Sequence, residues 1–193
     1  MNNDRKEERL EYITGKILHL DGDRKYSQKA FKYYQKMGLM AIVKNIPEYK
    51  QPRVVYSMLS YYNPDILVVT GHDGMIRKNK EFYNIYNYKN SKYFIETVKE
   101  ARRYEKDSKK DLSIFAGACE SFFEALIMAG ADFASSPARI LIDFQDPLVI
   151  ANKIATTEYL KYITIQDIEG ELRDGKKGIG GIGTTGKKHV IFT

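Results

Sequence analysis

The chain has 193 residues, of which 43% are apolar and 29% are charged, a balance typical of a globular domain and not of a disordered chain. It contains no apolar run near the roughly 20 residues that cross a bilayer, and its hydrophilic start does not resemble a signal peptide, so no membrane partner is expected. A single cysteine, Cys119, excludes an internal disulfide framework. The net charge of +6 arises in residues 76–110, which hold 11 Lys and Arg against 5 Asp and Glu.

Strand-like and helix-like segments alternate along the chain, which predicts an α/β fold: a three-layer α/β/α sandwich with a mostly parallel central sheet. The expected strands are residues 17–20, 39–43, 66–70, 112–116, 133–135, 140–142 and 162–165. The expected helices are residues 26–37, 54–62, about 91–106 and 120–129, with a last helix beginning at Asp146-Pro147. Residues 1–170 are expected to form one domain, and the Gly- and Lys-rich residues 171–193 a flexible loop or tail.

Two of these strands end in residues that carry chemistry. Residues 66–70 lead into Gly71-His72-Asp73-Gly74, and residues 112–116 lead into Gly117-Ala118-Cys119. Because the carboxyl ends of parallel strands share one edge of a sheet, neighbouring strands bring His72 and Cys119 to the same edge. The sequence therefore predicts a pair formed by a thiol and an imidazole.

Cys119 is expected where a strand turns into a helix. The amides and dipole of a helix N-terminus stabilise a thiolate, and a nearby His72 can accept the thiol proton and return it to a leaving amine. The alternative is that Cys119 is an inert, buried, small apolar residue, which is common for free cysteines. His19 and His189 are expected to be structural or solvent-exposed.

A histidine after one strand and an Ala-Cys after a later strand resemble the caspase-like cysteine endopeptidases, with Cys119 following His72 by 47 residues. A closer resemblance is to the YabG family of sporulation-specific proteases. It rests on seven sequences that cover nearly the whole chain from about residue 12: ILHLDGD (17–23), PDILVVTGHDG (64–74), NSKYFIETVKEAR (90–102), IFAGACESFFEAL (114–126), AGADFASSPARI (129–140), DPLVIANKIATT (146–157) and GKKGIGGI (175–182).

This resemblance implies that residues 1–170 are the catalytic domain of a thiol protease that cleaves proteins after basic residues, mainly Arg. The implied substrates are spore-coat and germination proteins, processed in the cytoplasm of sporulating cells or in association with the spore. No cofactor and no metal are implied. Members of the family usually carry an additional N-terminal segment, so a shortened homologue is expected here.

The remaining candidate residues surround the predicted pair. Asp73 is a candidate to orient His72 or bind a cation, and Gly74 or a neighbouring amide to complete an oxyanion hole. In caspase-like enzymes the histidine is usually followed directly by glycine, whereas Asp73 intervenes here. The expected pocket for the basic side chain follows the strand after Cys119, with these candidates: Ser135, Ser136, Asp143 and Asp146.

Two other functions remain open from the sequence. An amidotransferase-like or esterase-like hydrolase normally has its cysteine in a Gly-x-Cys-x-Gly turn, but Ser121 stands at the second glycine position here. A non-catalytic module for spore-coat assembly or nucleic-acid binding would use the basic residues 76–110, although no known nucleic-acid motif occurs there. The Gly-rich residues 178–183 lack the strand-to-helix setting of a phosphate loop and are expected to be mobile or to cover substrate.

Overall fold

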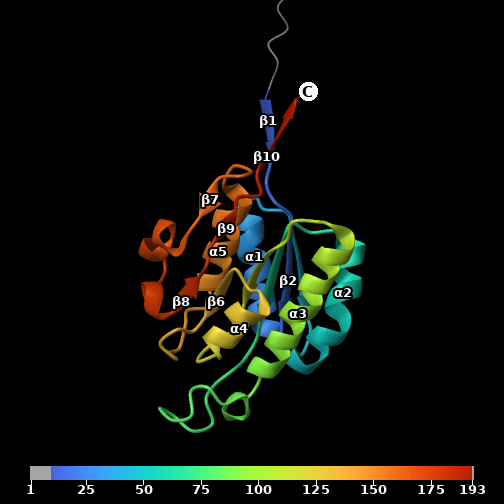
Figure 1. Ribbon diagram of the computed structural model, residues 1–193. Coiled ribbons are helices and arrows are strands. Elements are labelled where there is room, and N and C mark those ends of the chain that lie inside the picture. Colours follow the sequence, from blue (N-terminus) through green and yellow to red (C-terminus); the bar gives the residue numbers. More distant parts are fainter. Residues whose placement is uncertain (1–9, 193) are drawn as a thin grey trace, which may run out of the picture.

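The computed structural model describes residues 10–192 (Figure 1). The helices in this range are α1 (Arg24–Lys36), α2 (Gln51–Tyr62), α3 (Ser91–Ser108), α4 (Phe123–Ala129) and α5 (Asp146–Thr156). The strands are β1 (Leu10–Ile13), β2 (Ile17–Asp21), β3 (Ala41–Asn45), β4 (Ile66–Thr70), β5 (Ser113–Ala116), β6 (Phe133–Ser135), β7 (Tyr162–Ile163), β8 (Ile179–Gly181), β9 (Thr184–Thr185) and β10 (His189–Phe192).

Six of these strands form one sheet in the order β3-β2-β4-β5-β6-β8. The first five strands are parallel, and β8 pairs antiparallel with β6 at one edge. The continuous apolar run of β4 lies at the centre, because a parallel sheet that is covered on both faces buries every side chain of its central strands. The predicted α/β sandwich with a mostly parallel sheet is confirmed.

Side chains alternate between the two faces of this sheet. Ile66 and Val68 face an apolar cluster that includes residues of α1 and α5. Leu67 and Val69 face a second cluster that includes residues of α2, α3 and α4. The molecule therefore has three layers, with α1 and α5 on one side of the sheet and α2, α3 and α4 on the other (Figure 1).

The C-terminal segment differs from its expected form as a flexible loop or tail. Its residues 179–181 are β8, and Ile179 is fully buried in the same apolar cluster as α1 and α5. A Cβ atom at Gly180 would lie 2.8 Å from the Phe123 ring, and one at Gly181 would lie 2.3 Å from the Asp132 carbonyl oxygen. The glycines are required by close packing of an edge strand, so the expectation of a mobile or substrate-covering loop was wrong.

Two further local predictions were wrong. Residues 140–142 form no strand, since they cross from β6 to α5 without pairing in a sheet. The helix expected from residue 120 begins at Phe123, four residues after Cys119. Glu120 has a φ of +56°, which is incompatible with a helix that starts at the cysteine.

The ends of the described chain pair with each other. β1 and β10 form an antiparallel ribbon that projects from the body, at the end opposite to the long segment between β4 and α3 (Figure 1). Residues 1–9, the hydrophilic start noted in the sequence, lie outside the described residues. Within residues 10–192, no helix combines the length and apolar character that crossing a bilayer requires.

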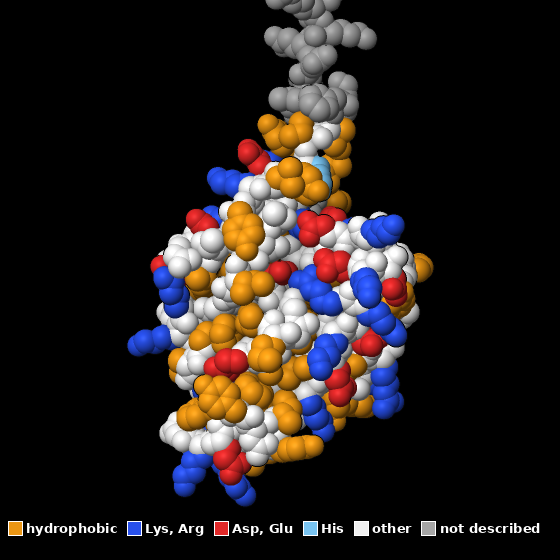
Figure 2. Space-filling model, viewed as in Figure 1, with side chains coloured by type: hydrophobic (Ala, Val, Ile, Leu, Met, Phe, Trp, Pro, Cys, Tyr) orange, Lys and Arg blue, Asp and Glu red, His pale blue; other side chains and the backbone are white. Residues whose placement is uncertain are grey.

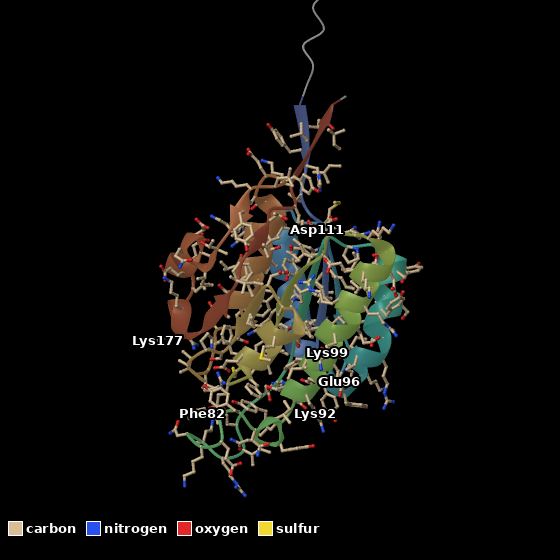
Figure 3. All side chains as sticks on the ribbon, viewed as in Figure 1. Phe82, Lys92, Glu96, Lys99, Asp111 and Lys177 are labelled. Atoms are coloured by element: carbon tan, nitrogen blue, oxygen red, sulfur yellow. The ribbon has the colours of Figure 1, made fainter. Side chains whose placement is uncertain are left out.

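The basic residues 76–110 carry many of their charges in ion pairs. The pairs within this region are Arg77–Glu81, Arg102–Glu105 and Arg103–Glu100, and those with other segments are Lys78–Glu120, Arg102–Asp132 and Lys110–Asp65. Figure 3 shows Lys92, Glu96 and Lys99 along α3, and Figure 2 shows Lys and Arg interspersed with Asp and Glu over this side of the molecule. A mixed surface of this kind is a weak electrostatic attractor for nucleic acid.

Candidate active site

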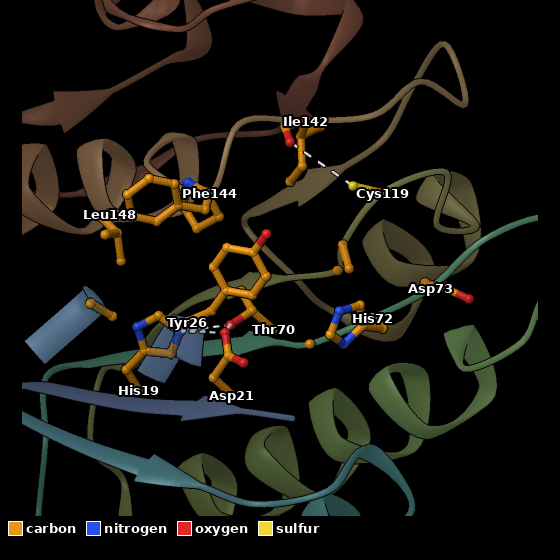
Figure 4. A pocket seen from close by; sticks show the side chains of 15 residues that line it. His19, Asp21, Tyr26, Thr70, His72, Asp73, Cys119, Ile142, Phe144 and Leu148 are labelled. Carbon is orange, nitrogen blue, oxygen red and sulfur yellow. Dashed lines mark hydrogen bonds and ion pairs between the residues drawn. The ribbon is translucent and has the colours of Figure 1, made fainter. Parts of the chain in front are cut away.

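His72 and Cys119 follow adjacent parallel strands. β4 and β5 pair in register from Ile66↔Ser113 to Val69↔Ala116, so the loops after them leave the sheet at the same edge. Both side chains line one cavity of about 150 Å³ at that edge. In Figure 4 both side chains lie to the right of Tyr26, with Cys119 above His72. The predicted meeting of the two loops at a shared sheet edge is confirmed.

Cys119 lies in a tight turn between β5 and α4. Its side chain is partly exposed, and Sγ lies 3.9 Å from the carbonyl oxygen of Ile142. The turn depends on Gly117, which has a φ of +112° and whose added Cβ would lie 2.8 Å from the Ser135 carbonyl oxygen. Because α4 starts only at Phe123, this local turn, and not a helix N-terminus, presents the thiol.

His72 is the exposed partner, with 62% of its side chain accessible to solvent. Its backbone N–H donates to the Glu48 carboxylate at 2.7 Å, which fixes the start of the loop after β4. Its ring lies 6.1 Å from the Tyr26 ring, and its Nε2 lies 3.8 Å from Asp23 Oδ2. The imidazole therefore faces an acid from the loop after β2, a neighbour that the sequence did not reveal.

Asp23 holds that position because it is the N-cap of α1. Its Oδ1 accepts hydrogen bonds from the backbone N–H groups of Lys25 at 2.7 Å and Tyr26 at 2.9 Å. A capping carboxylate is fixed relative to its helix, so its second oxygen has a defined direction. Here Oδ2 is the oxygen nearest to His72.

Asp73 does not orient the His72 ring. Its carboxylate accepts hydrogen bonds from the N–H groups of Gly74 and Asn90 and from the hydroxyls of Ser91 and Ser121. Ser121 Oγ in turn accepts from the Ala118 N–H at 2.9 Å, so this acid connects the loop of His72 to the loop of Cys119. Burial raises the pKa of Asp73, and its hydrogen bonds oppose that shift.

The expectation that Gly74 is an oxyanion donor does not fit the structure either, because its N–H donates to the Asp73 carboxylate at 2.9 Å. Among the described residues, the N–H groups of Cys119 and Asp73 donate no hydrogen bond, and both residues line the cavity. Glu120 faces away from the thiol, since it accepts from the Met75 N–H and pairs with Lys78.

The four residues expected to form the pocket for a basic side chain do not line this cavity. Ser135 and Ser136 are fully buried, and their hydroxyls donate to the carbonyl oxygens of Ala118 and Ile140. Asp146 accepts from the N–H groups of Asp143 and Arg173 near the start of α5, and Asp143 accepts from Gln145. These side chains satisfy local backbone groups, which is the usual role of such residues in turns and caps.

The floor of the cavity is polar, and sequence reasoning missed it. His19 and Asp21 of β2 and Thr70 of β4 line it, and all three are buried. Burial lowers the pKa of His19 to about 3, so this imidazole is neutral, and burial raises the pKa of Asp21. The signal in the sequence was three polar residues, His19, Asp21 and Thr70, in two strands that are otherwise apolar.

No cluster of three or more His, Cys, Asp and Glu side chains within residues 10–192 is arranged to hold a metal ion.

A sequence profile described as YabG peptidase U57 matches residues 1–192. The chain belongs to this family. The resemblance to the YabG family noted in the sequence is thereby confirmed. The Sporulation-specific protease YabG of Bacillus subtilis (strain 168) is 41% identical over 175 residues, which are 91% of this chain and 60% of that protein. This chain thus spans about three fifths of the length of that relative.

Among solved structures, the receiver domain of the histidine kinase CKI1 from Arabidopsis thaliana has 17% sequence identity and a TM-score of 0.40, over 62% of this chain and 80% of that one. A likeness at this level bears on neither the fold nor the function.

Proposed function

We propose that this member of the YabG family is a cysteine endopeptidase in which Cys119 is the nucleophile and His72 is the general acid and base. The observation that carries the proposal is the convergence of these two side chains in one cavity, from the loops after adjacent strands β4 and β5. The Bacillus subtilis relative, which is named a sporulation-specific protease, supports peptide hydrolysis as the reaction.

In the proposed mechanism His72 takes the proton from the Cys119 thiol, and the thiolate attacks the carbonyl carbon of the scissile peptide bond. The tetrahedral intermediate collapses as protonated His72 gives its proton to the leaving amine, which leaves an acyl thioester on Cys119. His72 then accepts a proton from water, the resulting hydroxide attacks the thioester, and the thiol is regenerated as the carboxyl product departs. No cofactor enters this sequence.

The backbone N–H groups of Cys119 and Asp73 are proposed to stabilise the oxyanion, in place of Gly74. Their free amides and their position on the cavity wall support this assignment. Preorganised amides of this kind lower the barrier because they are already aimed at the developing charge. Asp23 is proposed as the positioning residue of His72, since its fixed carboxylate stabilises the imidazolium that forms when the thiol ionises.

The physiological substrates are proposed to be spore-coat and germination proteins, cleaved after arginine in sporulating cells. Support for sporulation comes from the relative's name, and support for a basic residue comes from the acidic cavity floor. A nucleic-acid-binding role has less support, because several cations of residues 76–110 are engaged in ion pairs.

The proposal is tested by incubating the full chain with an arginyl chloromethyl ketone and mapping the alkylated residue by peptide mass spectrometry. Labelling of Cys119, its loss in His72→Gln, and absence of peptide hydrolysis by Cys119→Ala are the expected results. Hydrolysis that persists in Cys119→Ala would eliminate the mechanism. Thermal unfolding of each variant verifies that the fold is retained.

A further inference from the structure

Four side chains form a hydrogen-bonded chain below the cavity. His19 and Asp21 project from β2, and Thr70 from the paired end of β4, where Asp21 and Thr70 lie opposite each other. His19 Nε2 lies 2.7 Å from Thr70 Oγ1, and Thr70 Oγ1 lies 2.6 Å from Asp21 Oδ2. Tyr34 of α1 closes the other end, with its hydroxyl 3.0 Å from His19 Nδ1.

The proton positions in this chain follow from the carboxylate. An ionised Asp21 only accepts, so the Thr70 hydroxyl donates to it and must itself accept from the His19 Nε2–H. His19 Nδ1 then accepts from the Tyr34 hydroxyl. Because the imidazole is neutral, it supports Asp21 only through the hydrogen bonds by way of Thr70. It brings no positive charge to the carboxylate.

Asp21 is consequently a buried acid without a cation. It is 6% exposed, and the ring nitrogen nearest to it, Nε2 of the neutral His19, lies 3.8 Å from Asp21 Oδ2. No Lys or Arg nitrogen within residues 10–192 lies within 4.0 Å of its carboxylate. Its charged neighbours are the acids Asp23 and Glu48, which make the site more negative. Removing a carboxylate from water without a counter-charge is unfavourable, and a cationic ligand group reverses that cost.

The cavity above Asp21 matches a long side chain with a charged end. Its walls are apolar, and the rings of Tyr26 and Phe144 lie 5.9 Å apart at an angle of 31°. In Figure 4, Asp21 lies below Tyr26, and His72 and Cys119 lie to the right of both. An aliphatic stem therefore packs on the rings while its cationic head reaches the acid.

We propose that Asp21 is the specificity residue that binds the guanidinium of the substrate residue on the amino side of the cleaved bond. Each oxygen of Asp21 already accepts one hydrogen bond, from Thr70 or from the Asp23 N–H, and keeps a further lone pair for the ligand. Two free acceptor positions on one carboxylate suit the planar fork of a guanidinium better than the point charge of an ammonium. The identity of the ligand as a peptide rests on the proposed function, whereas the cation site does not.

The experiment compares matched peptides that carry arginine or the neutral isostere citrulline before the cleaved bond. For the wild-type chain we expect kcat/KM for the arginine peptide to exceed that for citrulline by about 100-fold or more. Asp21→Asn keeps the shape and the acceptor for Thr70 but removes the charge. It should lower kcat/KM for the arginine peptide by about 100-fold and change that for citrulline by less than about 3-fold.

Asp143→Asn is the matched control. Asp143 is an acid that does not line the cavity, so this variant should retain the preference for arginine. An unchanged ratio of arginine to citrulline cleavage in folded Asp21→Asn overturns the proposal. Should Asp21→Asn not fold, Asp21→Ser removes the charge with a smaller neutral side chain and is measured in the same way.

Binding separates this proposal from the proposed function. Calorimetry with Cys119→Ala should detect the arginine-like cation agmatine but not its neutral urea analogue, and Asp21→Asn added to that variant should abolish the binding. Agmatine binding that needs Asp21, together with a wild-type chain that cleaves neither peptide, supports the cation site and contradicts the peptidase. Hydrolysis that proceeds with equal rates on both peptides contradicts the cation site alone.

Discussion

The opening and the floor of the cavity are built in different ways. At the opening, Cys119 and His72 are partly or largely exposed and are positioned by turns, backbone hydrogen bonds and the cap of α1. At the floor, His19 and Asp21 are buried and are positioned by side chains that hydrogen-bond to one another.

The difference agrees with the roles proposed for the two regions. Groups that exchange protons with substrate and water must be accessible, and an exposed side chain is fixed most effectively by the backbone that carries it. A group that selects a charge gains strength from burial, because low local polarity strengthens electrostatic attraction. Burial in turn requires that every remaining polar atom has a partner.

The largest effect should come from removing the base at the opening. His72→Gln is expected to lower kcat by about 1,000-fold, since general acid and base catalysis typically contributes 10²–10⁴. The fold should persist because the side chain is exposed. Steady-state hydrolysis of an arginine peptide measures the loss, and His189→Gln, which removes an exposed imidazole outside the cavity, is the matched control. Equal activity of the two variants would contradict the assignment of His72.

The next largest effect should come from breaking the link between the two loops. Asp73→Ala leaves two hydroxyls and two N–H groups without their acceptor, so we expect the free energy of unfolding to fall by about 3 kcal/mol. Urea denaturation measures this fall in the free energy of unfolding. Asp143→Ala, which loses one local hydrogen bond, should cost less than about 1 kcal/mol. Similar losses in both variants would show that Asp73 has no special structural role.

The free energy of unfolding should depend on pH through His19 at the floor of the cavity. Its pKa is about 3 in the folded chain against 6.5 in the unfolded chain, so its contribution to stability is full above pH 6.5 and is lost as pH falls toward 3. Between pH 7.5 and pH 5 this loss is about 2 kcal/mol. Burial raises the pKa of Asp21, so this acid acts on stability in the opposite direction.

His19→Gln isolates the histidine, since glutamine supplies one donor and one acceptor but does not titrate. The free energy of unfolding of the wild type should fall more steeply with decreasing pH than that of the variant. Parallel curves from chemical denaturation at pH 7.5 and pH 5 would contradict a neutral buried His19.

The smallest effect should come from Asp23, which contacts both regions: its carboxylate faces His72, and its backbone N–H donates to Asp21. Asp23→Asn retains a capping side chain but loses the charge near His72, so kcat/KM should fall by about 3- to 10-fold while the free energy of unfolding stays nearly unchanged. Asp23→Ala should additionally lower the free energy of unfolding by about 1 kcal/mol through loss of the cap. An unchanged kcat/KM in Asp23→Asn would restrict this residue to capping.

The sequence located the opening but not the floor. His72 and Cys119 were found because each follows an apolar strand, and strand ends are readable from local pattern. Asp23 and Asp21 were not found, because their proximity to the cavity depends on β2 lying beside β4 in the sheet. The acids sought after β6, Asp143 and Asp146, turned out to accept hydrogen bonds from backbone N–H groups: those of their own turn and, for Asp146, that of Arg173.

The sequence by itself determined the α/β class, most strands and helices, and the two loops that carry the thiol and the imidazole, since hydrophobic periodicity and turn residues act over short distances along the chain. Only the tertiary structure decided the order of the strands, the packing of β8 from a glycine-rich segment, and the burial of Asp21 without a cation. The physical reason is that charge, burial and hydrogen-bond partners depend on residues far apart in sequence. Their meeting is set by how the layers pack as a whole.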